Sequence, residues 1–306
     1  MKADAERATG APDGQEAYEQ LRTIRDLLRY AVSRFNSAGL SYGHGTQSAL
    51  DEASFLVLEG LHLPHENVQS FLDAHLLGSE VARCLDLIEQ RVLTRKPAPY
   101  LVNKAYIGGV PFYVDERVIV PRSFVAHILQ SELIGGSADP LIADSRRIGR
   151  VLDLCTGSGC IAVIAALRFA GAQVDAVDLS SEALEVARRN VSQNGLEQRT
   201  RILQGDLFGP LDAQRYDLIL TNPPYVSDRD MSALPREYLY EPRMALTGGL
   251  DGMDIVRRIL RAAPAHLNEG GALLCEIGSG REILEREFPA LRFRWLCEDA
   301  CFWVQP

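Results

Sequence analysis

The chain has 306 residues, 46% of them hydrophobic, which is enough to bury a sizeable core in about two domains. Its formal net charge of -9 argues against a surface that grips nucleic-acid phosphates everywhere, because that affinity needs clustered Lys and Arg, and it suits a basic partner. The six cysteines lack a CxxC spacing, so we expect no metal site and no disulfide framework. With neither a signal peptide nor an apolar stretch of about 20 residues, the protein is expected to be soluble, cytoplasmic and without membrane contacts.

The first third of the chain is predicted to be a tail followed by helices. Residues 1–15 are small, polar and charged, a composition typical of a mobile tail. Apolar residues recur at spacings of three and four over 17–36, which predicts one amphipathic helix, and similar stripes predict helices over 48–61 and 79–93. We therefore expect a small helical bundle over 16–95, whose placement suggests substrate recognition.

After the predicted bundle, the helical spacing of apolar residues gives way to prolines, glycines and short apolar runs. Pro97 and Pro99 disfavour helix and favour extended chain. Two short apolar runs, 106–107 and 111–114, flank Gly108 and Gly109, which predicts a β-hairpin, and 118–120 could add a third strand. Residues 96–124 are thus expected to form a linker with a β-hairpin between the two domains.

The remainder, residues 125–306, shows the alternation of strands and helices that predicts an α/β domain with a mostly parallel sheet. A helix between two strands is long enough to carry the chain back for parallel pairing. The expected strands are 151–154, 174–177, 201–203, 217–221, 272–277, 293–296 and 302–305, and the expected helices are 160–169, 181–194 and 254–266.

A glycine-containing turn joins the first of these strands to its helix, at the position where open α/β sheets bind ligands. Asp178 ends the second strand, 19 residues after Gly159, where a carboxylate can accept hydrogen bonds from ribose hydroxyls. We therefore expect a nucleoside-containing cofactor, although an ordinary tight turn without a ligand would use similar residues. The residues of the turn and its preceding strand end are Asp153, Cys155, Thr156, Gly157, Ser158 and Gly159.

The choice between cofactors depends on two positions near this turn. Nicotinamide cofactors usually bind a G-x-G-x-x-G loop, but Ala162 occupies the third glycine position here. Asp153 would repel a pyrophosphate and attract the ammonium group of a methionine moiety. The pattern favours S-adenosylmethionine, with S-adenosylhomocysteine as its product.

The motif Asn222-Pro223-Pro224-Tyr225 directly follows the predicted strand over 217–221. An NH2 group has two donors, and the Asn222 side-chain oxygen together with the Pro223 carbonyl can accept both. The nitrogen lone pair would then point at the methyl group, an orientation worth up to roughly 7 to 11 kcal/mol in favourable cases. Tyr225 is expected to lie against the planar substrate group or the adenosine. These four residues are the candidate catalytic set.

Two other functions fit parts of this pattern. A DNA amino-methyltransferase would use the same motif on a flipped base, but it should also carry a basic groove and a target-reading domain, which are not evident here. A non-catalytic S-adenosylmethionine-binding assembly factor would not need an intact Asn222 motif.

Taken with Gly205-Asp206-Leu207-Phe208, Arg95-Lys96-Pro97 and Val120-Pro121-Arg122, these motifs resemble the bacterial HemK-type protein-glutamine N5-methyltransferases. The resemblance runs from about Leu21 almost to the C-terminus. It implies a Rossmann-like class I S-adenosylmethionine-dependent methyltransferase sheet with a small N-terminal helical bundle and a connecting β-hairpin. It also implies that 155–159 hold the methionine part, that Asp178 holds the ribose and that Asp206 and Leu207 flank the adenine, with Phe112 near the cofactor pocket.

Two branches of this family differ in substrate: one modifies peptide release factors and the other ribosomal protein L-three. The release-factor branch typically reads PRPDTE or PRPETE after the hairpin, whereas this chain reads Pro121-Arg122-Ser123-Phe124. It therefore resembles the ribosomal branch, which implies ribosomal protein L-three as partner and no sequence-specific contact with nucleic acid. The short segment 297–301 departs from the family's glycine-rich hairpin and is expected to affect the last strand pair.

Overall fold

The computed structural model describes residues 14–305, and contacts within the chain define two compact units that separate between Asn103 and Lys104. The predicted linker over 96–124 is therefore divided, because 96–103 belongs to the helical unit and the hairpin belongs to the second unit. Most of the predicted tail lies outside the described residues, although Gly14 already begins a helix. Among residues 14–305, no helix is both long and apolar enough to cross a membrane.

The first unit is built from helices around one apolar core, as the sequence predicts. Side chains such as Leu27, Phe35, Leu56 and Ile88 are completely buried in this core. The apolar stripes of three of the helices meet there, which explains the spacing of three and four in the sequence. The helices are α1 (Gly14–Gln20), α2 (Ile24–Ser37), α3 (Ala49–Leu61), α4 (Gly78–Thr94) and α5 (Ala98–Val102).

Two expectations for this unit are wrong. The single helix predicted over 17–36 is two helices, because Thr23 accepts a hydrogen bond from the Asp26 N–H and Asp26 caps the Thr23 N–H in return, which starts α2 afresh. The extended chain expected at the prolines is found at Pro97 but not at Pro99. Pro99 lies in the first turn of α5, where its missing N–H has no intrahelical partner to lose.

The second unit begins with the predicted hairpin, formed by β1 (Ala105–Ile107) and β2 (Val110–Phe112) in antiparallel pairing. The third strand expected over 118–120 does not form. Val118 and Val120 are nevertheless buried, so their apolar character serves packing and not strand pairing.

A seven-stranded sheet forms the centre of this unit, in the order β5-β4-β3-β6-β7-β9-β8. β3 to β7 are parallel and β9 is antiparallel to both of its neighbours, which confirms the mostly parallel sheet. The strands are β3 (Arg150–Leu154), β4 (Gln173–Asp178), β5 (Thr200–Gln204), β6 (Tyr216–Thr221), β7 (Leu267–Glu276), β8 (Arg294–Leu296) and β9 (Cys301–Val304).

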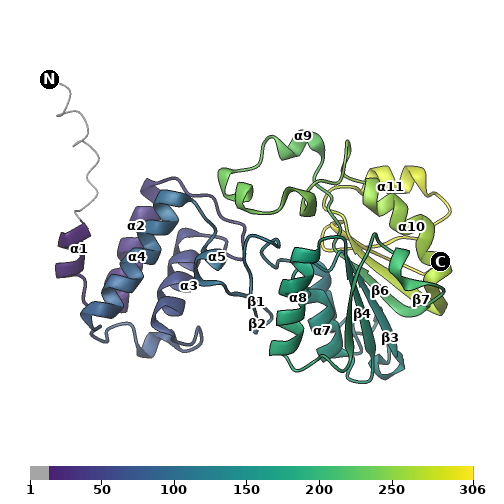
Figure 1. The fold of residues 1–306 in the computed structure, drawn as a ribbon, viewed down its shortest axis with the longest axis horizontal. Coiled ribbons are helices and arrows are strands. Elements are labelled where there is room, and N and C mark those ends of the chain that lie inside the picture. Colours follow the sequence, from purple (N-terminus) through teal and green to yellow (C-terminus); the bar gives the residue numbers. More distant parts are fainter. Residues whose placement is uncertain (1–13, 306) are drawn as a thin grey trace. The chain divides into compact units, whose positions relative to one another are not determined.

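Helices cover both faces of the sheet, with α7 and α8 on one side and α10 on the other (Figure 1). Residues on successive strand positions enter opposite cores: Val151 belongs to the α7 side and Leu152 to the α10 side. The helices are α6 (Phe124–Gln130), α7 (Cys160–Arg168), α8 (Ser181–Gln193), α9 (Asp228–Met231), α10 (Asp254–His266) and α11 (Arg281–Glu287).

This topology places a crevice at the carboxyl end of β3. From β3 the chain proceeds to β4 and β5 on one side and then returns to β6 on the other. The loops after β3 and β6 therefore diverge, and ligands of open α/β sheets bind where this reversal occurs.

The last strand pair forms despite the short connection. β8 and β9 pair antiparallel, and the turn between them is closed by Cys297, Glu298 and Asp299, all with positive φ. Left-handed backbone at three successive non-glycine residues is rare. The family's glycine-rich hairpin is thus replaced by a tighter turn, and the strand pairing is kept.

Candidate active site

A cavity lies at the carboxyl ends of β3, β4 and β6, at the predicted crevice. It combines predicted site residues with residues from two segments that the sequence did not single out. The predicted residues that line it are Cys155, Gly157, Asp178, Asp206, Leu207, Asn222 and Pro224. The unpredicted ones include Arg117, Val118, Ile119, Pro242, Met244, Ala245 and Thr247.

The turn after β3 presents backbone to this cavity. Cys155 and Gly157 both have positive φ, and a Cβ added at Gly157 would meet nothing within 4 Å, so the turn is open there. At Gly159, by contrast, a Cβ would lie 3.1 Å from the Cβ of Ala187 on α8. Gly159 therefore allows close helix packing and does not line the cavity, and Thr156 and Ser158 are buried behind the turn.

Asp178, the last residue of β4, lines the cavity. Its carboxylate accepts the Gly157 N–H at 2.8 Å and the Ser180 N–H at 2.9 Å. Within residues 14–305 no cationic side chain pairs with it, and burial raises its pKa. A carboxylate has about four acceptor sites, so Asp178 keeps acceptor capacity for donors of a ligand such as ribose hydroxyls.

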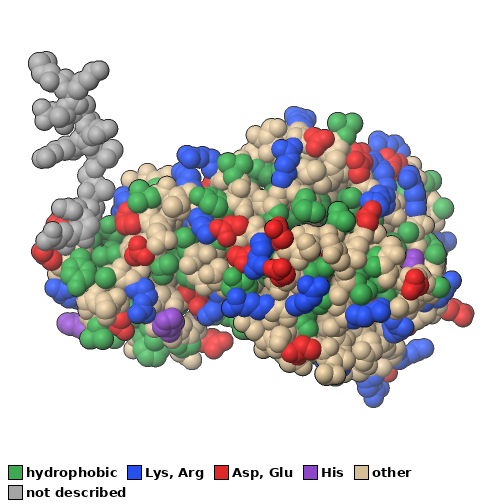
Figure 2. Space-filling model, viewed as in Figure 1, with side chains coloured by type: hydrophobic (Ala, Val, Ile, Leu, Met, Phe, Trp, Pro, Cys, Tyr) green, Lys and Arg blue, Asp and Glu red, His purple; other side chains and the backbone are tan. Residues whose placement is uncertain are grey.

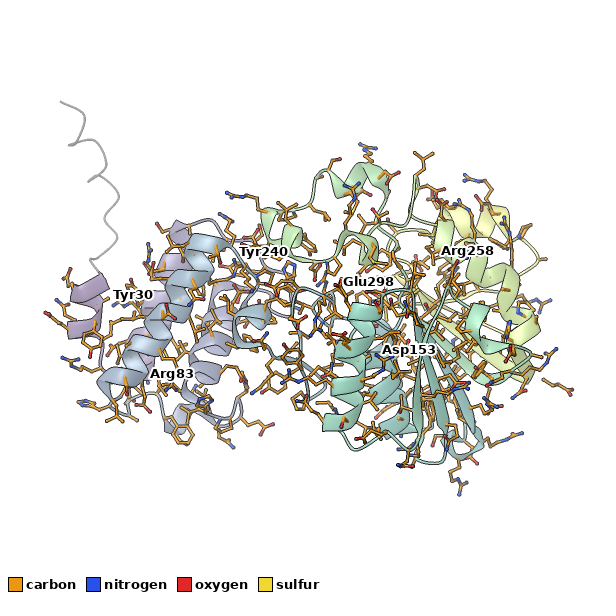
Figure 3. All side chains as sticks on the ribbon, viewed as in Figure 1. Tyr30, Arg83, Asp153, Tyr240, Arg258 and Glu298 are labelled. Carbon is orange, nitrogen blue, oxygen red and sulfur yellow. The ribbon has the colours of Figure 1, made fainter. Side chains whose placement is uncertain are left out.

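Asp153 lies elsewhere than the sequence analysis expects, because it does not line the cavity. It is completely buried and its Oδ2 accepts hydrogen bonds from the Thr156 hydroxyl at 2.5 Å and from the Ala162 N–H at 3.0 Å. Side chains alternate along a strand, so Asp153 points to the α7 side of the sheet while Leu152 and Leu154 point to the other. Asp153 is labelled in Figure 3, and its contacts with Thr156 and Ala162 are those of a cap for the start of α7.

Asp206 and Leu207 lie beside the cavity after β5. The Asp206 carboxylate pairs at 2.7 Å with Arg258 on α10, which is labelled in Figure 3, so this carboxylate is already engaged within the protein. Leu207 has a φ of 51°, an uncommon conformation for a leucine that is often found at functional sites.

The Asn222–Tyr225 motif follows β6 directly, and the surrounding chain holds it closely. Asn222 and Pro224 line the cavity, whereas Pro223 and Tyr225 do not. A Cβ at Gly252 would lie 2.3 Å from the Tyr225 carbonyl oxygen, and one at Gly248 would lie 2.7 Å from that of Pro224. Only glycine lets the 248–252 loop approach the motif this closely.

Phe112 also lies elsewhere than the sequence analysis expects. Its side chain is 1% exposed and packs in the core on the α7 side of the sheet, while Val118 and Ile119 line the cavity. The segment after the hairpin is anchored by Asn190 on α8, whose side chain bonds both the N–H and the carbonyl of Tyr113 and also the Ser158 carbonyl. No sequence motif marks that connection.

The second unpredicted wall of the cavity, Pro242 to Thr247, is joined by backbone pairing to Val226, which directly follows the Asn222–Tyr225 loop. The Val226 N–H donates to the Leu246 carbonyl at 2.9 Å and the Gly248 N–H to the Val226 carbonyl at 2.9 Å. The glycines at 248, 249 and 252 are the sequence signal that could have identified this wall. Within residues 14–305 no group of three His, Cys, Asp or Glu side chains is placed to hold a metal ion.

Comparisons with known proteins find relatives along most of this chain. Residues 141–249 match the family model of the methyltransferase small domain. The ribosomal protein uL3 glutamine methyltransferase of Bradyrhizobium diazoefficiens is 54% identical over 290 residues, covering 93% of this chain and 91% of its relative. The protein of the same name from Bordetella pertussis is 54% identical, covering 91% and 92%. A human methyltransferase 10 domain containing protein has 18% identity and a TM-score of 0.44, covering 64% of this chain and 88% of the other.

Proposed function

Because the chain belongs to the family of ribosomal protein uL3 glutamine methyltransferases, we propose that it transfers a methyl group from S-adenosylmethionine to the side-chain amide nitrogen of a glutamine in uL3. The observation that carries this proposal is the position of Asn222, at the end of β6 and in the wall of the cavity that Asp178 closes. One cavity thus holds a carboxylate suited to a ribose and an amide oxygen suited to an NH2 group.

The methyl donor fits the residues that line the cavity. Asp178 faces the cavity with acceptor capacity left for ribose hydroxyls, and the open backbone at Cys155 and Gly157 leaves room for the methionine part. Leu207 and Ile255 offer apolar contacts for the adenine. When bound, S-adenosylmethionine supplies an electrophilic methyl group on a positively charged sulfur.

The protein's part in the reaction is orientation. The Asn222 side-chain oxygen and the Pro223 carbonyl accept the two hydrogens of the glutamine NH2, which directs its lone pair toward the methyl group. An amide nitrogen is a weak nucleophile because its lone pair is delocalised into the carbonyl. Acceptors held by a rigid Pro-Pro segment favour a more tetrahedral nitrogen as positive charge develops.

The charge of the chain agrees with a protein substrate. A formal net charge of -9 favours a basic partner such as a ribosomal protein. On the face drawn in Figure 2, Lys and Arg side chains are interspersed with Asp and Glu, unlike the continuous basic stripe of many nucleic-acid-binding proteins. We assign uL3 recognition to the helical unit, and a ribosomal substrate implies a cytoplasmic enzyme.

The test is the intact mass of ribosomal proteins from cells that lack this gene, with rescue by wild type or by Asn222→Ala. We expect uL3 to lose the mass of one methyl group and only the wild type to restore it. An unmethylated release factor instead would assign the chain to the sister substrate. If no protein changes mass, glutamine methylation is wrong and an amino group on a nucleic-acid base becomes the substrate to assay.

A further inference from the structure

Glu276, the last residue of β7, is a buried carboxylate that none of the predicted motifs includes. It is 3% exposed, and within residues 14–305 no basic side chain pairs with it. Its Oε2 accepts the Ser123 hydroxyl at 3.0 Å and the Phe124 N–H at 2.9 Å, and its Oε1 accepts the Tyr225 hydroxyl at 3.1 Å. Burial raises the pKa of Glu276, and these three donors oppose that shift by stabilising the charged form.

One of these contacts belongs to the catalytic loop. The hydroxyl of Tyr225 is held by Glu276, and its ring lies against Gly278, where a Cβ would be 3.0 Å from two ring carbons. The ring is therefore fixed at its tip and along one edge by residues at the end of β7. Tyr225 directly follows Pro224, which lines the cavity, so the position of its ring constrains the backbone of the loop.

The other two contacts belong to the start of α6. Ser123 is the N-cap residue of that helix, but its side chain makes no capping hydrogen bond and donates to Glu276 instead. The Phe124 N–H, which has no partner within the helix, is capped by the same carboxylate oxygen. Glu276 thus joins two segments that lie far apart in the sequence, the start of α6 and the catalytic loop.

We propose that Glu276 is a positioning residue for methyl transfer, which fixes Tyr225 and through it the acceptors of the Asn222–Tyr225 loop relative to the start of α6. The proposal rests on the proposed function. Catalysis by orientation is sensitive to small displacements of the groups that hold the nucleophile. A carboxylate accepts hydrogen bonds on both oxygens, whereas a glutamine that keeps its oxygen for the two α6 donors would turn its NH2 toward Tyr225, so the Tyr225 hydroxyl would lose its acceptor.

The experiment compares Glu276→Gln, Tyr225→Phe and the double variant, with uL3 and S-adenosylmethionine as substrates. Each single variant is expected to lower kcat about tenfold, the effect of one lost hydrogen bond in the transition state. The double variant should lose no more than about twofold beyond the single ones, because both changes remove the same contact. The Kd of S-adenosylmethionine, measured by calorimetry, should stay within about twofold of wild type.

Two further variants separate positioning from simple structural support. Ser123→Ala removes a donor at α6 and leaves the Tyr225 contact, so kcat should change less than in Tyr225→Phe. Glu285→Gln removes an exposed ion pair to Arg281 and should leave kcat unchanged. Should Glu276→Gln fold poorly, Tyr225→Phe still removes the contact while the cap of α6 stays intact.

Two results would overturn the proposal. If Tyr225→Phe keeps the wild-type kcat, or if the losses from the two single changes multiply in the double variant, Glu276 serves only as a helix cap. If wild-type protein fails to methylate uL3, the proposed function is wrong and this inference fails with it. The wild-type reaction therefore distinguishes the two failures.

Discussion

Strand β4 carries two aspartates three residues apart, and they have opposite roles. Asp175, near the start of the strand, pairs with Arg201 at 2.8 Å and Arg150 at 3.4 Å and accepts the Tyr216 hydroxyl at 2.7 Å. Asp178, at the carboxyl end, receives only backbone N–H groups and faces the cavity. The comparison shows that the oxygens of Asp175 are bonded by side chains of the protein, whereas Asp178 can still accept hydrogen bonds from a ligand.

The difference follows from the topology of the sheet. At the amino end of β4, neighbouring strands bring long arginine side chains over Asp175 from both sides. At the carboxyl end, the chains that leave β3 and β6 diverge, and the turn at Gly157 offers N–H donors with no side chain to fill the space. A buried carboxylate without a cation persists there because backbone donors stabilise it partly.

The largest effect is expected from removing the ligand-facing acid. Asp178→Ala should raise the Kd of S-adenosylmethionine about a hundredfold, or about 2.7 kcal/mol, because two hydrogen bonds to a charged group are lost. Isothermal titration calorimetry measures this directly. A rise of less than about threefold would show that ribose is held elsewhere.

Asp175→Ala is the matched variant at the other end of β4. It should lower the free energy of unfolding by roughly 2 to 3 kcal/mol, less than for a fully buried pair because Arg150 and Arg201 are half exposed. Urea denaturation reports the loss. The Kd of S-adenosylmethionine should stay within about twofold of wild type. A large change in this Kd would contradict the purely structural role of Asp175.

Asp153 is expected to make the stability of the protein depend on pH, because burial raises its pKa to about 7. Between about pH 4 and that value the folded state holds a proton that the unfolded state has released, so stability is lost as pH rises through the folded pKa. We expect the free energy of unfolding of wild type to fall by roughly 2 to 3 kcal/mol from pH 5 to pH 8, relative to Asp153→Asn. Parallel pH profiles for the two proteins in urea titrations would contradict this assignment.

The smallest effect is expected from removing the Tyr216 hydroxyl, which donates a hydrogen bond to Asp175 beside its two arginine partners. Tyr216→Phe should cost about 1 kcal/mol of unfolding free energy, because one buried hydrogen bond is lost while both arginines remain. Thermal denaturation is sufficient to detect it. A loss as large as that of Asp175→Ala would mean that the hydroxyl, and not the ion pairs, holds the cluster together.

Expectations based on local patterns were largely met. The helix predicted over 254–266 is α10, and the strands predicted over 151–154 and 217–221 match β3 and β6 to within a residue. Two of the failures occurred where a cap or a proline acts within a single turn. Thr23 divides the first predicted helix, and Pro99 begins α5 where extended chain was expected.

The sequence by itself determined the turn after β3, the carboxylate at Asp178 and the Asn222–Tyr225 loop, because each lies within a few residues of a strand end. Only the tertiary structure decided which side of the sheet Asp153 faces, which segments close the cavity and what holds Tyr225. The Ser123 hydroxyl reaches Glu276 across 153 residues of sequence. Such contacts depend on how strands and loops pack in three dimensions, and no local periodicity encodes them.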